Sequence, residues 1–223
     1  MNLLALPFLA FALVAAKADP PAPAPAIPIN PPAEVLADPA NKLMLQLSNG
    51  GTVVIEMRPD AAPNHVQRIQ TLVRKGFYDG TIFHRVIPGF MAQGGDPTGT
   101  GEGGSKLPDL KAEFNSLPHL RGSVAAARAE PEDSANSQFY IMFAPKASLD
   151  HKYTVFGRVI SGMDVVDRIA IGEPPANPTK IVHASLGDGS APAAAPPAPA
   201  QTPAPSEPPA PAKEPEPETT PGG

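Results

Sequence analysis

Proline is concentrated at the two ends of this 223-residue chain and is sparse between them. Of the 32 prolines, nine lie in residues 1–39 and twelve in residues 188–223, which leaves eleven for residues 41–187. Proline has no amide hydrogen and a fixed φ angle, so a proline-dense segment favours extended polyproline II over a helix or a sheet. Ten of the twelve aromatic residues lie in the middle segment, and a packed core needs such side chains. We therefore predict one folded domain over residues 41–187.

The first 18 residues have the composition of a cleavable secretory signal. Residues 3–16 are apolar and uncharged, and Ala16-Lys17-Ala18 supplies the small-x-small pattern of a signal-peptidase site. Crossing a hydrocarbon core takes about 20 residues, so this run is too short to span one. We predict cleavage after Ala18 and a periplasmic or secreted protein with no stable membrane span. An uncleaved anchor or a buried terminal strand is the alternative, because no Lys or Arg precedes the apolar run.

Residues 19–40 and 188–223 alternate alanine and proline, and we predict a linker and a disordered tail. At about 3.1 Å per residue, the extended tail reaches roughly 110 Å, and a solvated spacer is its simplest interpretation. Its Ala-Pro and Glu-Pro steps are also candidate ligands for a groove on the folded domain. Tethering gives them an effective concentration of about millimolar order, so self-interaction of residues 188–223 with such a groove is the alternative.

The composition excludes several classes of function. The chain has no cysteine, which excludes disulfides, thiolate zinc sites and cysteine nucleophiles. Its net charge of −5 argues against a nucleic acid as partner, because that affinity depends on Lys and Arg neutralising phosphates. The five histidines are scattered, so we expect no metal site. Gly99–Gly104 matches the letters of a dinucleotide fingerprint, but Pro108 follows and no helix begins there, which favours a turned loop.

The middle segment has the pattern of many short strands and two helices. Lys42–Leu47 and Thr52–Met57 flank Asn49-Gly50-Gly51, the turn of a β-hairpin. One helix is expected from Pro63 to Gly76 and a short one near Met163–Ile169. The other strand-like runs are Thr81–Ile87, Ser123–Ala127, Gln138–Phe143, Thr154–Ile160 and Lys180–Leu186. Without regular βαβ alternation, this pattern favours a closed or nearly closed β-barrel capped by helices.

The segment Phe83–Asp96 (FHRVIPGFMAQGGD) carries the most informative side chains. Arg85 lies in an apolar run, Phe90 and Met91 follow, and Gln93 precedes a glycine pair. In a purely structural interpretation, Arg85 snorkels from an edge strand while Phe90 and Met91 belong to the core. These residues alone establish only that a cation and an amide border an apolar surface.

This segment closely resembles the signature of the cyclophilin family of peptidyl-prolyl cis-trans isomerases. Residues 137–141 (SQFYI), the pair 149–150 (LD) and residues 155–159 (VFGRV) resemble further family motifs. KGFYDGTIFHR and RGSVAAAR, at residues 121–128, resemble bacterial members. The resemblance runs from about Lys42 to Leu186. It implies a closed eight-stranded antiparallel β-barrel capped by two helices, in a bacterial secreted or periplasmic isomerase.

The resemblance also implies roles for individual residues. Arg85 is implied as the catalytic group, a permanent positive charge beside the prolyl nitrogen of the substrate. Gln93 is implied to hold the substrate carbonyl or Arg85 itself, and His84 to have a supporting role. The residues implied to contact the proline and the flanking peptide are Phe90, Met91, Gln93, Ala127, Arg128, Gln138, Tyr140, Leu149, His84 and Tyr153. No metal and no other cofactor is implied.

Three positions depart from the family pattern. Tyr140 stands where the family usually has phenylalanine, so a hydroxyl enters the wall of the proline socket and needs a hydrogen-bond partner or water. Ser148 stands where eukaryotic members have a tryptophan that contributes to cyclosporin binding, which predicts weak inhibition by that drug. Tyr153 best matches a histidine that often lines the site.

These observations predict an isomerase that acts on Xaa-Pro bonds in exported or envelope proteins. The binding partners are proline-containing polypeptides. We expect a monomer, because a closed barrel leaves no free sheet edge. The alternative is a non-catalytic, proline-peptide-binding chaperone module that keeps the groove without turnover.

Overall fold

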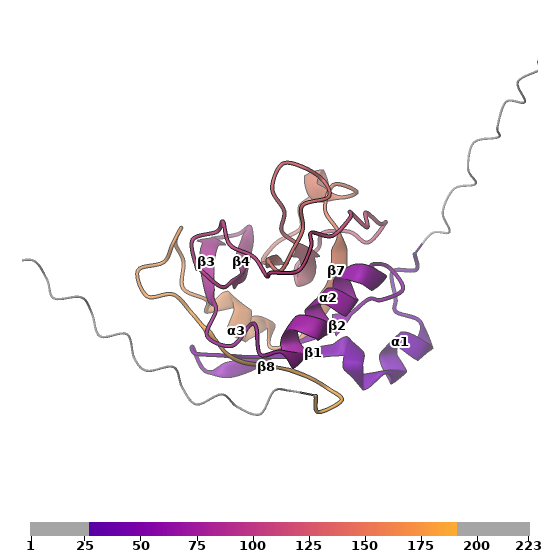
Figure 1. The fold of residues 1–223 in the computed structure, drawn as a ribbon, viewed down its shortest axis with the longest axis horizontal. Helices are drawn as coiled ribbons and strands as arrows, with labels where there is room; N and C mark the ends of the chain where they lie inside the picture. The colour runs from indigo at the N-terminus through magenta and orange to yellow at the C-terminus, as the bar shows by residue number, and fades with distance from the viewer. Residues whose placement is uncertain (1–26, 191–223) are drawn as a thin grey trace, which may run out of the picture.

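An eight-stranded antiparallel sheet forms the body of the protein (Figure 1). The computed structural model describes residues 27–190, so the predicted signal at residues 1–18 and most of the tail lie outside the described range. The strand order is β3-β4-β6-β5-β7-β2-β1-β8, and the two edge strands meet at a bridge between Ile82 and Lys180. The strands are β1 Lys42–Leu47, β2 Gly51–Met57, β3 Ile82–Ile87, β4 Met91–Asp96, β5 Ser123–Ala126, β6 Phe139–Met142, β7 Val155–Ser161 and β8 Ile181–Leu186. The eight-stranded antiparallel architecture is confirmed.

One face of the curled sheet encloses the main hydrophobic core. Leu43, Leu45 and Leu47 alternate along β1, and each is at most 2% exposed. Alternation with a period of two places every second side chain on the same face of a strand, which is why this run folds as a half-buried strand. In the same interior, the Phe83 and Phe139 rings pack edge to face with centroids 6.3 Å apart.

Strand β4 is the one strand that the sequence pattern did not indicate. Its sequence MAQGGD has two glycines and no β-branched residue, so the usual strand composition is missing. The glycines let neighbouring chain segments approach closely. Gly95 has a φ of 84°, and a Cβ added there would lie 2.6 Å from the carbonyl oxygen of Ser137.

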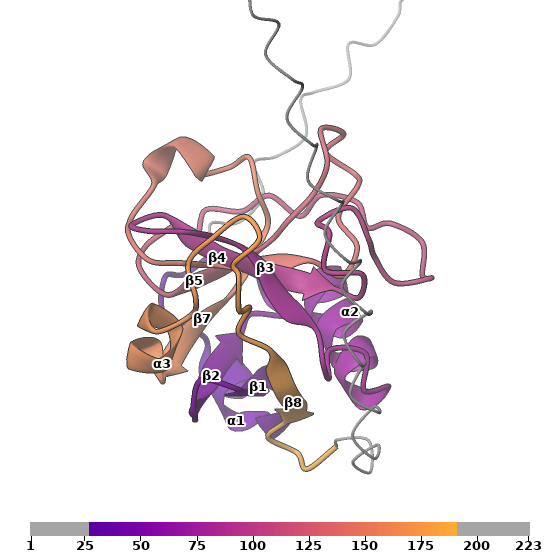
Figure 2. The ribbon, with the colours of Figure 1, turned by 90° about the vertical axis from the view of Figure 1, so that its left-hand side faces the viewer.

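Two helices cover the core at different places, as predicted (Figure 2). Helix α2, Pro63–Arg74, begins with proline at its first turn and is followed by Gly76, whose φ of 67° ends the helix. Helix α3, Met163–Asp167, is two residues shorter than predicted, and Ile169 beyond it is still buried. The apolar faces of both helices pack into the main core.

A third helix was not predicted. Helix α1, Ala33–Ala37, lies within residues 19–40, for which the proline content indicated an extended linker. The buried Arg58 guanidinium anchors the chain before α1, because it donates hydrogen bonds to the carbonyl oxygens of Pro28 and Ile29 at 2.7 and 3.0 Å. Asp60 holds the same guanidinium through two further bonds. Residues 27–40 therefore pack against the domain, which corrects the prediction of a purely extended spacer there.

Within residues 27–190, none of the helices has the length and apolar character needed to cross a membrane.

Candidate active site

A β-bulge in β3 turns Arg85 out of the barrel. Phe83 pairs with Gly94 and Arg85 with Gln93, so two steps along β3 match one step along β4. Bulges of this kind re-aim a side chain relative to the normal alternation. As a result Phe83 and Val86 both point into the core, while Arg85 lies on the outer face beside Gln93.

Strand register continues this outer row across the sheet. Gln93 is the direct neighbour of Tyr140 on β6, and Tyr140 is the neighbour of Ala125 on β5. Met91 and Met142 form the next pair on the same face. The apolar residues of this row belong to a second cluster, separate from the barrel interior, whose buried members are Ala61, Met91, Leu117, Ala125, Tyr140, Met142 and Val155.

A hollow of about 140 Å³ opens over this second cluster, and we call it the small hollow. Its lining residues are Arg85, Phe90, Met91, Gln93, Ala127, Arg128, Tyr140, Leu149 and Tyr153. Nine of the eleven predicted site residues are thus brought together from four separate parts of the chain. The two that do not line it are His84 and Gln138.

The Arg85 guanidinium is held by a partner that the sequence did not indicate. Its Nε donates to Oε2 of Glu173 at 2.9 Å, and the two side chains are 41% and 50% exposed. Glu173 lies in the loop before β8, next to Gly172, which forms a backbone bridge with Val86. Among residues 27–190, the only hydrogen bond found for this guanidinium uses Nε, so its two Nη groups are available at the rim of the small hollow.

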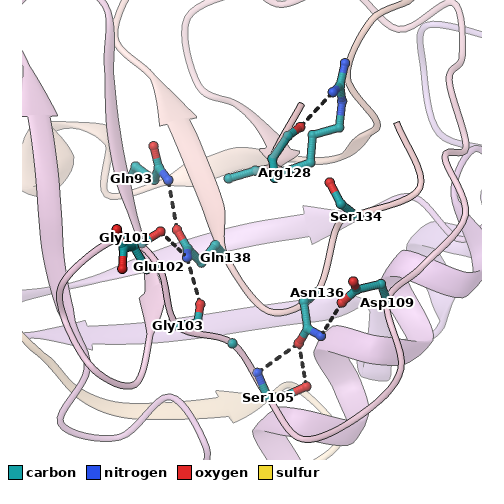
Figure 3. A pocket seen from close by; sticks show the side chains of 13 residues that line it. Gln93, Gly101, Glu102, Gly103, Ser105, Asp109, Arg128, Ser134, Asn136 and Gln138 are labelled. Carbon is teal, nitrogen blue, oxygen red and sulfur yellow. Dashed lines mark hydrogen bonds between the residues drawn. The ribbon is translucent and has the colours of Figure 1, made fainter. Parts of the chain in front are cut away.

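A larger hollow of about 550 Å³, which we call the large hollow, adjoins the small one. Figure 3 shows the residues that line the large hollow. Gln93, Ala127 and Arg128 line both. Gln138 lines the large hollow, and its Oε1 accepts a hydrogen bond from Nε2 of Gln93 at 2.9 Å. Its own Nε2 donates to the carbonyl oxygens of Gly101 and Gly103, both at 2.8 Å. The two predicted glutamines therefore form one polar chain between the hollows.

The Gly99–Gly104 segment is a turned loop wrapped around a buried carboxylate, and no helix begins there. Asp96 accepts hydrogen bonds from the backbone nitrogens of Thr98, Gly101 and Gly103 at 2.7, 2.6 and 3.1 Å. Burial disfavours the charged form, but these bonds outweigh it and lower the pKa of Asp96 to about 2. A buried anion thus shapes one wall of the large hollow.

His84 lies under this loop and does not line the small hollow, in contrast to its predicted place at the site. It precedes Arg85 at the bulge, and its ring is 3.5 Å from where a Cβ on Gly101 would be. The ring is 5% exposed, and within the described part of the chain neither nitrogen has a hydrogen-bond partner. Burial lowers the pKa of His84, so the ring is neutral at pH 7.

The Tyr140 hydroxyl has a protein partner. Its oxygen lies 3.1 Å from Nε2 of His119, and Nδ1 of His119 lies 2.9 Å from Oδ1 of Asp150. Sequence reasoning missed His119 and included Asp150 only as part of the family pair 149–150, because only the tertiary fold brings these three segments together. The Tyr153 ring packs edge-on against Tyr140, and the Arg128 guanidinium lies 4.8 Å from the centroid of Tyr153.

Comparison with known proteins decides the family. Residues 42–186 match the family model for cyclophilin type peptidyl-prolyl cis-trans isomerases. The chain belongs to the cyclophilin family. This cyclophilin is 48% identical over 166 residues to a probable peptidyl-prolyl cis-trans isomerase of Brucella suis biovar 1 (strain 1330), with 67% of this chain and 84% of the relative covered.

Two solved cyclophilins share its fold. The cyclophilin AquaCyp293 from Hirschia baltica has a TM-score of 0.62 and 33% identity, covering 67% of this chain and 74% of that one. A Cryptosporidium parvum enzyme, whose crystal structure was determined in the presence of the dipeptide Ala-Pro, has a TM-score of 0.61 and 27% identity. The alignment with that enzyme covers 65% of this chain and 98% of that one. This cyclophilin is accordingly a peptidyl-prolyl cis-trans isomerase.

The cyclophilin site has the chemistry of a binding surface bordered by two arginines, Arg85 and Arg128. Among the described residues, no three acidic or histidine side chains gather in the manner of a metal site. The polar groups that line the small hollow are the guanidinium groups of Arg85 and Arg128, the Gln93 amide and two tyrosine hydroxyls, which can stabilise charge and orient carbonyl groups. Such an arrangement is suited to a conformational reaction of a bound peptide.

Proposed function

We propose that this cyclophilin accelerates Xaa-Pro rotation by stabilising the twisted amide with the charge of Arg85. Amide resonance gives the planar bond a rotational barrier of about 18–20 kcal/mol. When the bond twists, resonance is lost and the prolyl nitrogen gains a lone pair. A fixed cation beside that lone pair stabilises the twisted state more than either planar isomer, and only this difference accelerates the reaction.

The small hollow supports this proposal because it joins an apolar floor to an exposed cation. Met91 and Leu149 supply apolar wall, and Arg85 stands at the rim with its Nε edge occupied by Glu173. A proline ring seated on the floor would bring its nitrogen close to the free Nη groups. This juxtaposition is the single observation that carries the proposal.

The large hollow is proposed to take the peptide that precedes the proline. It adjoins the small hollow, and Gln93 lies at the boundary with Gln138 beside it. Amide groups at this place can pair with the backbone of an extended peptide. Glu102 and Asp109 also line the large hollow, so its floor suits polar or basic side chains.

The decisive experiment measures cis-trans isomerisation of an Ala-Pro tetrapeptide by wild type and Arg85→Ala. We expect kcat/KM to fall by about 100-fold or more, because an electrostatic group acting in the transition state is lost. Arg168→Ala is the matched control, since Arg168 is an exposed arginine that lines neither hollow, and it should keep full activity. Wild type that binds the peptide without accelerating its isomerisation would favour the chaperone module.

We further propose that the substrates are exported or envelope proteins. The support is the signal-like composition of residues 1–18, with the small-x-small pattern ending at Ala18. Cell fractionation followed by N-terminal sequencing of the mature protein tests this. A mature chain that begins at Asp19 in the exported fraction is expected, and a full-length chain in the cytoplasm would contradict it.

A further inference from the structure

A buried polar chain behind the small hollow has no part in the charge-based mechanism. It runs from the Tyr140 hydroxyl through the His119 ring to the Asp150 carboxylate. This polar chain reaches the small hollow at Tyr140, which is a lining residue, and its other end, Asp150, directly follows the lining residue Leu149. The three residues come from β6, from the loop before β5 and from the end of the 3₁₀ turn Ala147–Leu149.

The bonds of this chain fix the tautomer of His119. A carboxylate only accepts hydrogen bonds, so Nδ1 of His119 carries the hydrogen that it donates to Asp150. In the neutral ring, Nε2 is then an acceptor and receives the Tyr140 O–H. Asp150 accepts a second bond from the backbone nitrogen of His119 at 2.8 Å, which ties the two loops together. The His119 and Tyr140 rings stack with an interplanar angle of 18°.

We propose that His119 is a positioning residue for the proline socket. By holding the Tyr140 hydroxyl on one side and Asp150 on the other, it keeps the Tyr140 and Leu149 walls of the small hollow at a fixed spacing. It also points the hydroxyl hydrogen into the protein, so that the small hollow stays apolar despite a tyrosine in its wall. This inference rests on the proposed function, since it assigns the small hollow to the proline ring.

Protonation of His119 reverses this arrangement. With hydrogens on both nitrogens, Nε2 donates to the Tyr140 oxygen, and the tyrosine hydrogen must turn away toward the small hollow. The groups that face His119 are Asp150, Tyr140 and Tyr153; Arg128 lies over Tyr153, and His151 lies beside Asp150. Burial lowers the pKa of His119, although the hydrogen bond that its Nδ1–H donates to Asp150 opposes this, so the neutral form prevails at pH 7. Proline affinity should therefore fall as the pH is lowered below the ordinary histidine range of about 6.5.

The test is an NMR titration with an Ala-Pro tetrapeptide, which reports affinity whether or not the peptide is turned over. Tyr140→Phe, which keeps the ring, and His119→Phe each remove the same bond, and each should weaken binding about fivefold at pH 7. The double variant should bind no more weakly than His119→Phe alone, because the bond between Tyr140 and His119 is already lost in that variant. The kcat measured in parallel should stay within about twofold, since the chain positions a wall and does not touch the reacting amide.

A conservative variant and a matched control separate positioning from general loss of structure. His119→Gln can accept from Tyr140 and donate to Asp150 but does not titrate, so it should bind as wild type at pH 7 and lose the acid dependence. His183→Gln is the control, because His183 also pairs with a carboxylate, Asp79, at 2.9 Å but lies outside the small hollow. It should change neither the affinity nor its pH profile.

Two results would overturn the proposal. One is Tyr140→Phe binding the peptide as tightly as wild type at pH 7, and the other is single-variant losses that multiply in the double variant. If His119→Phe does not fold, as judged by circular dichroism, Tyr140→Phe and His119→Gln still decide. A wild type that binds the peptide without turnover would defeat the proposed enzymatic function, whereas the affinities of the variants would still test the positioning role.

Discussion

The two faces of β6 show how differently the inside and the outside of this barrel are built. Phe139 points into the main core among apolar side chains and needs no hydrogen-bond partner. Its neighbour Tyr140 points outward, and its hydroxyl depends on His119, 21 positions away in sequence. Arg85 likewise depends on Glu173, which is 88 positions away. Stability is therefore concentrated on the inner face, and the outer face is a surface whose groups are held individually by distant partners.

The largest effect should come from opening a cavity on the inner face. Phe139 is 1% exposed and packs against the rings of Tyr78 and Phe83. Phe139→Ala should lower the free energy of unfolding by about 3–5 kcal/mol, because it removes buried area and leaves a cavity. Urea unfolding followed by circular dichroism measures this loss.

The matched change on the outer face should act differently. Phe90 lines the small hollow and is only partly buried, so Phe90→Ala should cost less than about 2 kcal/mol and should mainly raise KM. If Phe90→Ala destabilised the protein as much as Phe139→Ala while leaving KM unchanged, the distinction between the two faces would be wrong.

A loss of stability smaller than that of Phe139→Ala is expected at the buried carboxylate below the large hollow. The pKa of Asp96 falls from 3.8 to about 2 in the folded protein, so its hydrogen bonds stabilise the fold above pH 4. At roughly 1.4 kcal/mol per pKa unit, Asp96→Asn should cost about 2 kcal/mol at pH 7. Wild type should lose the same contribution as the pH falls from about 4 to about 2, and Asp96→Asn should not.

Asp96→Asn should also disturb the two glutamines of the site, and a second measurement can detect this. Asp96 holds the loop whose carbonyl oxygens bind Gln138, and Gln138 in turn binds Gln93. Asp96→Asn should therefore broaden the NMR signals of both glutamine side-chain amides. The control is Asp164→Asn, whose carboxylate pairs with Arg168 at the surface and should alter neither stability nor these signals. Unchanged glutamine signals in Asp96→Asn would show that the loop does not position them.

Local patterns were sufficient to predict most of the fold. Alternating leucines in β1, Pro63 at the start of α2 and Gly76 after its end each determine the backbone by short-range sterics and burial. Strand β4 was not predicted, because its glycines allow neighbouring chain segments to approach closely and give β4 itself no strand-like composition. Helix α1 was not predicted, because the high proline content of residues 19–40 outweighed the five helix-compatible residues Ala33–Ala37. Arg58 helps to hold the segment before this helix against the domain.

The candidate site could be predicted only as far as family resemblance reached. The lining residues of the small hollow carry recognisable motifs, and the structure brings them together at one place. Their partners were not predicted. Glu173 and His119 lie in no recognised motif, and the family pair 149–150 does not indicate that Asp150 bonds to His119. His84 was assigned to the site from its position next to Arg85, but the bulge sends the two side chains to different surroundings.

A still smaller effect is expected at Glu173, the exposed partner of Arg85, which is the proposed catalytic group. Glu173 holds Nε of Arg85, but both side chains are about half exposed to solvent, where ion pairs are weak. Glu173→Gln should lower kcat/KM by about two- to threefold, because Arg85 becomes less well ordered. The difference should vanish in 1 M salt, where screening weakens the pair in wild type as well. A rise in kcat/KM would instead mean that Glu173 competes with the substrate for the charge.

The smallest effect should come from the C-terminal tail, and it tests whether the outer face stays open. If residues 191–223 are only a spacer, removing them leaves KM unchanged. A tail ligand at an effective concentration of about one millimolar, with a dissociation constant of similar size, would occupy half of the small hollows. Its removal would then lower KM about twofold and shift the NMR signals of Gln93 and Tyr153. Because a twofold change in KM is close to kinetic error, the chemical shifts decide, and unchanged shifts would leave residues 191–223 with no part in the site.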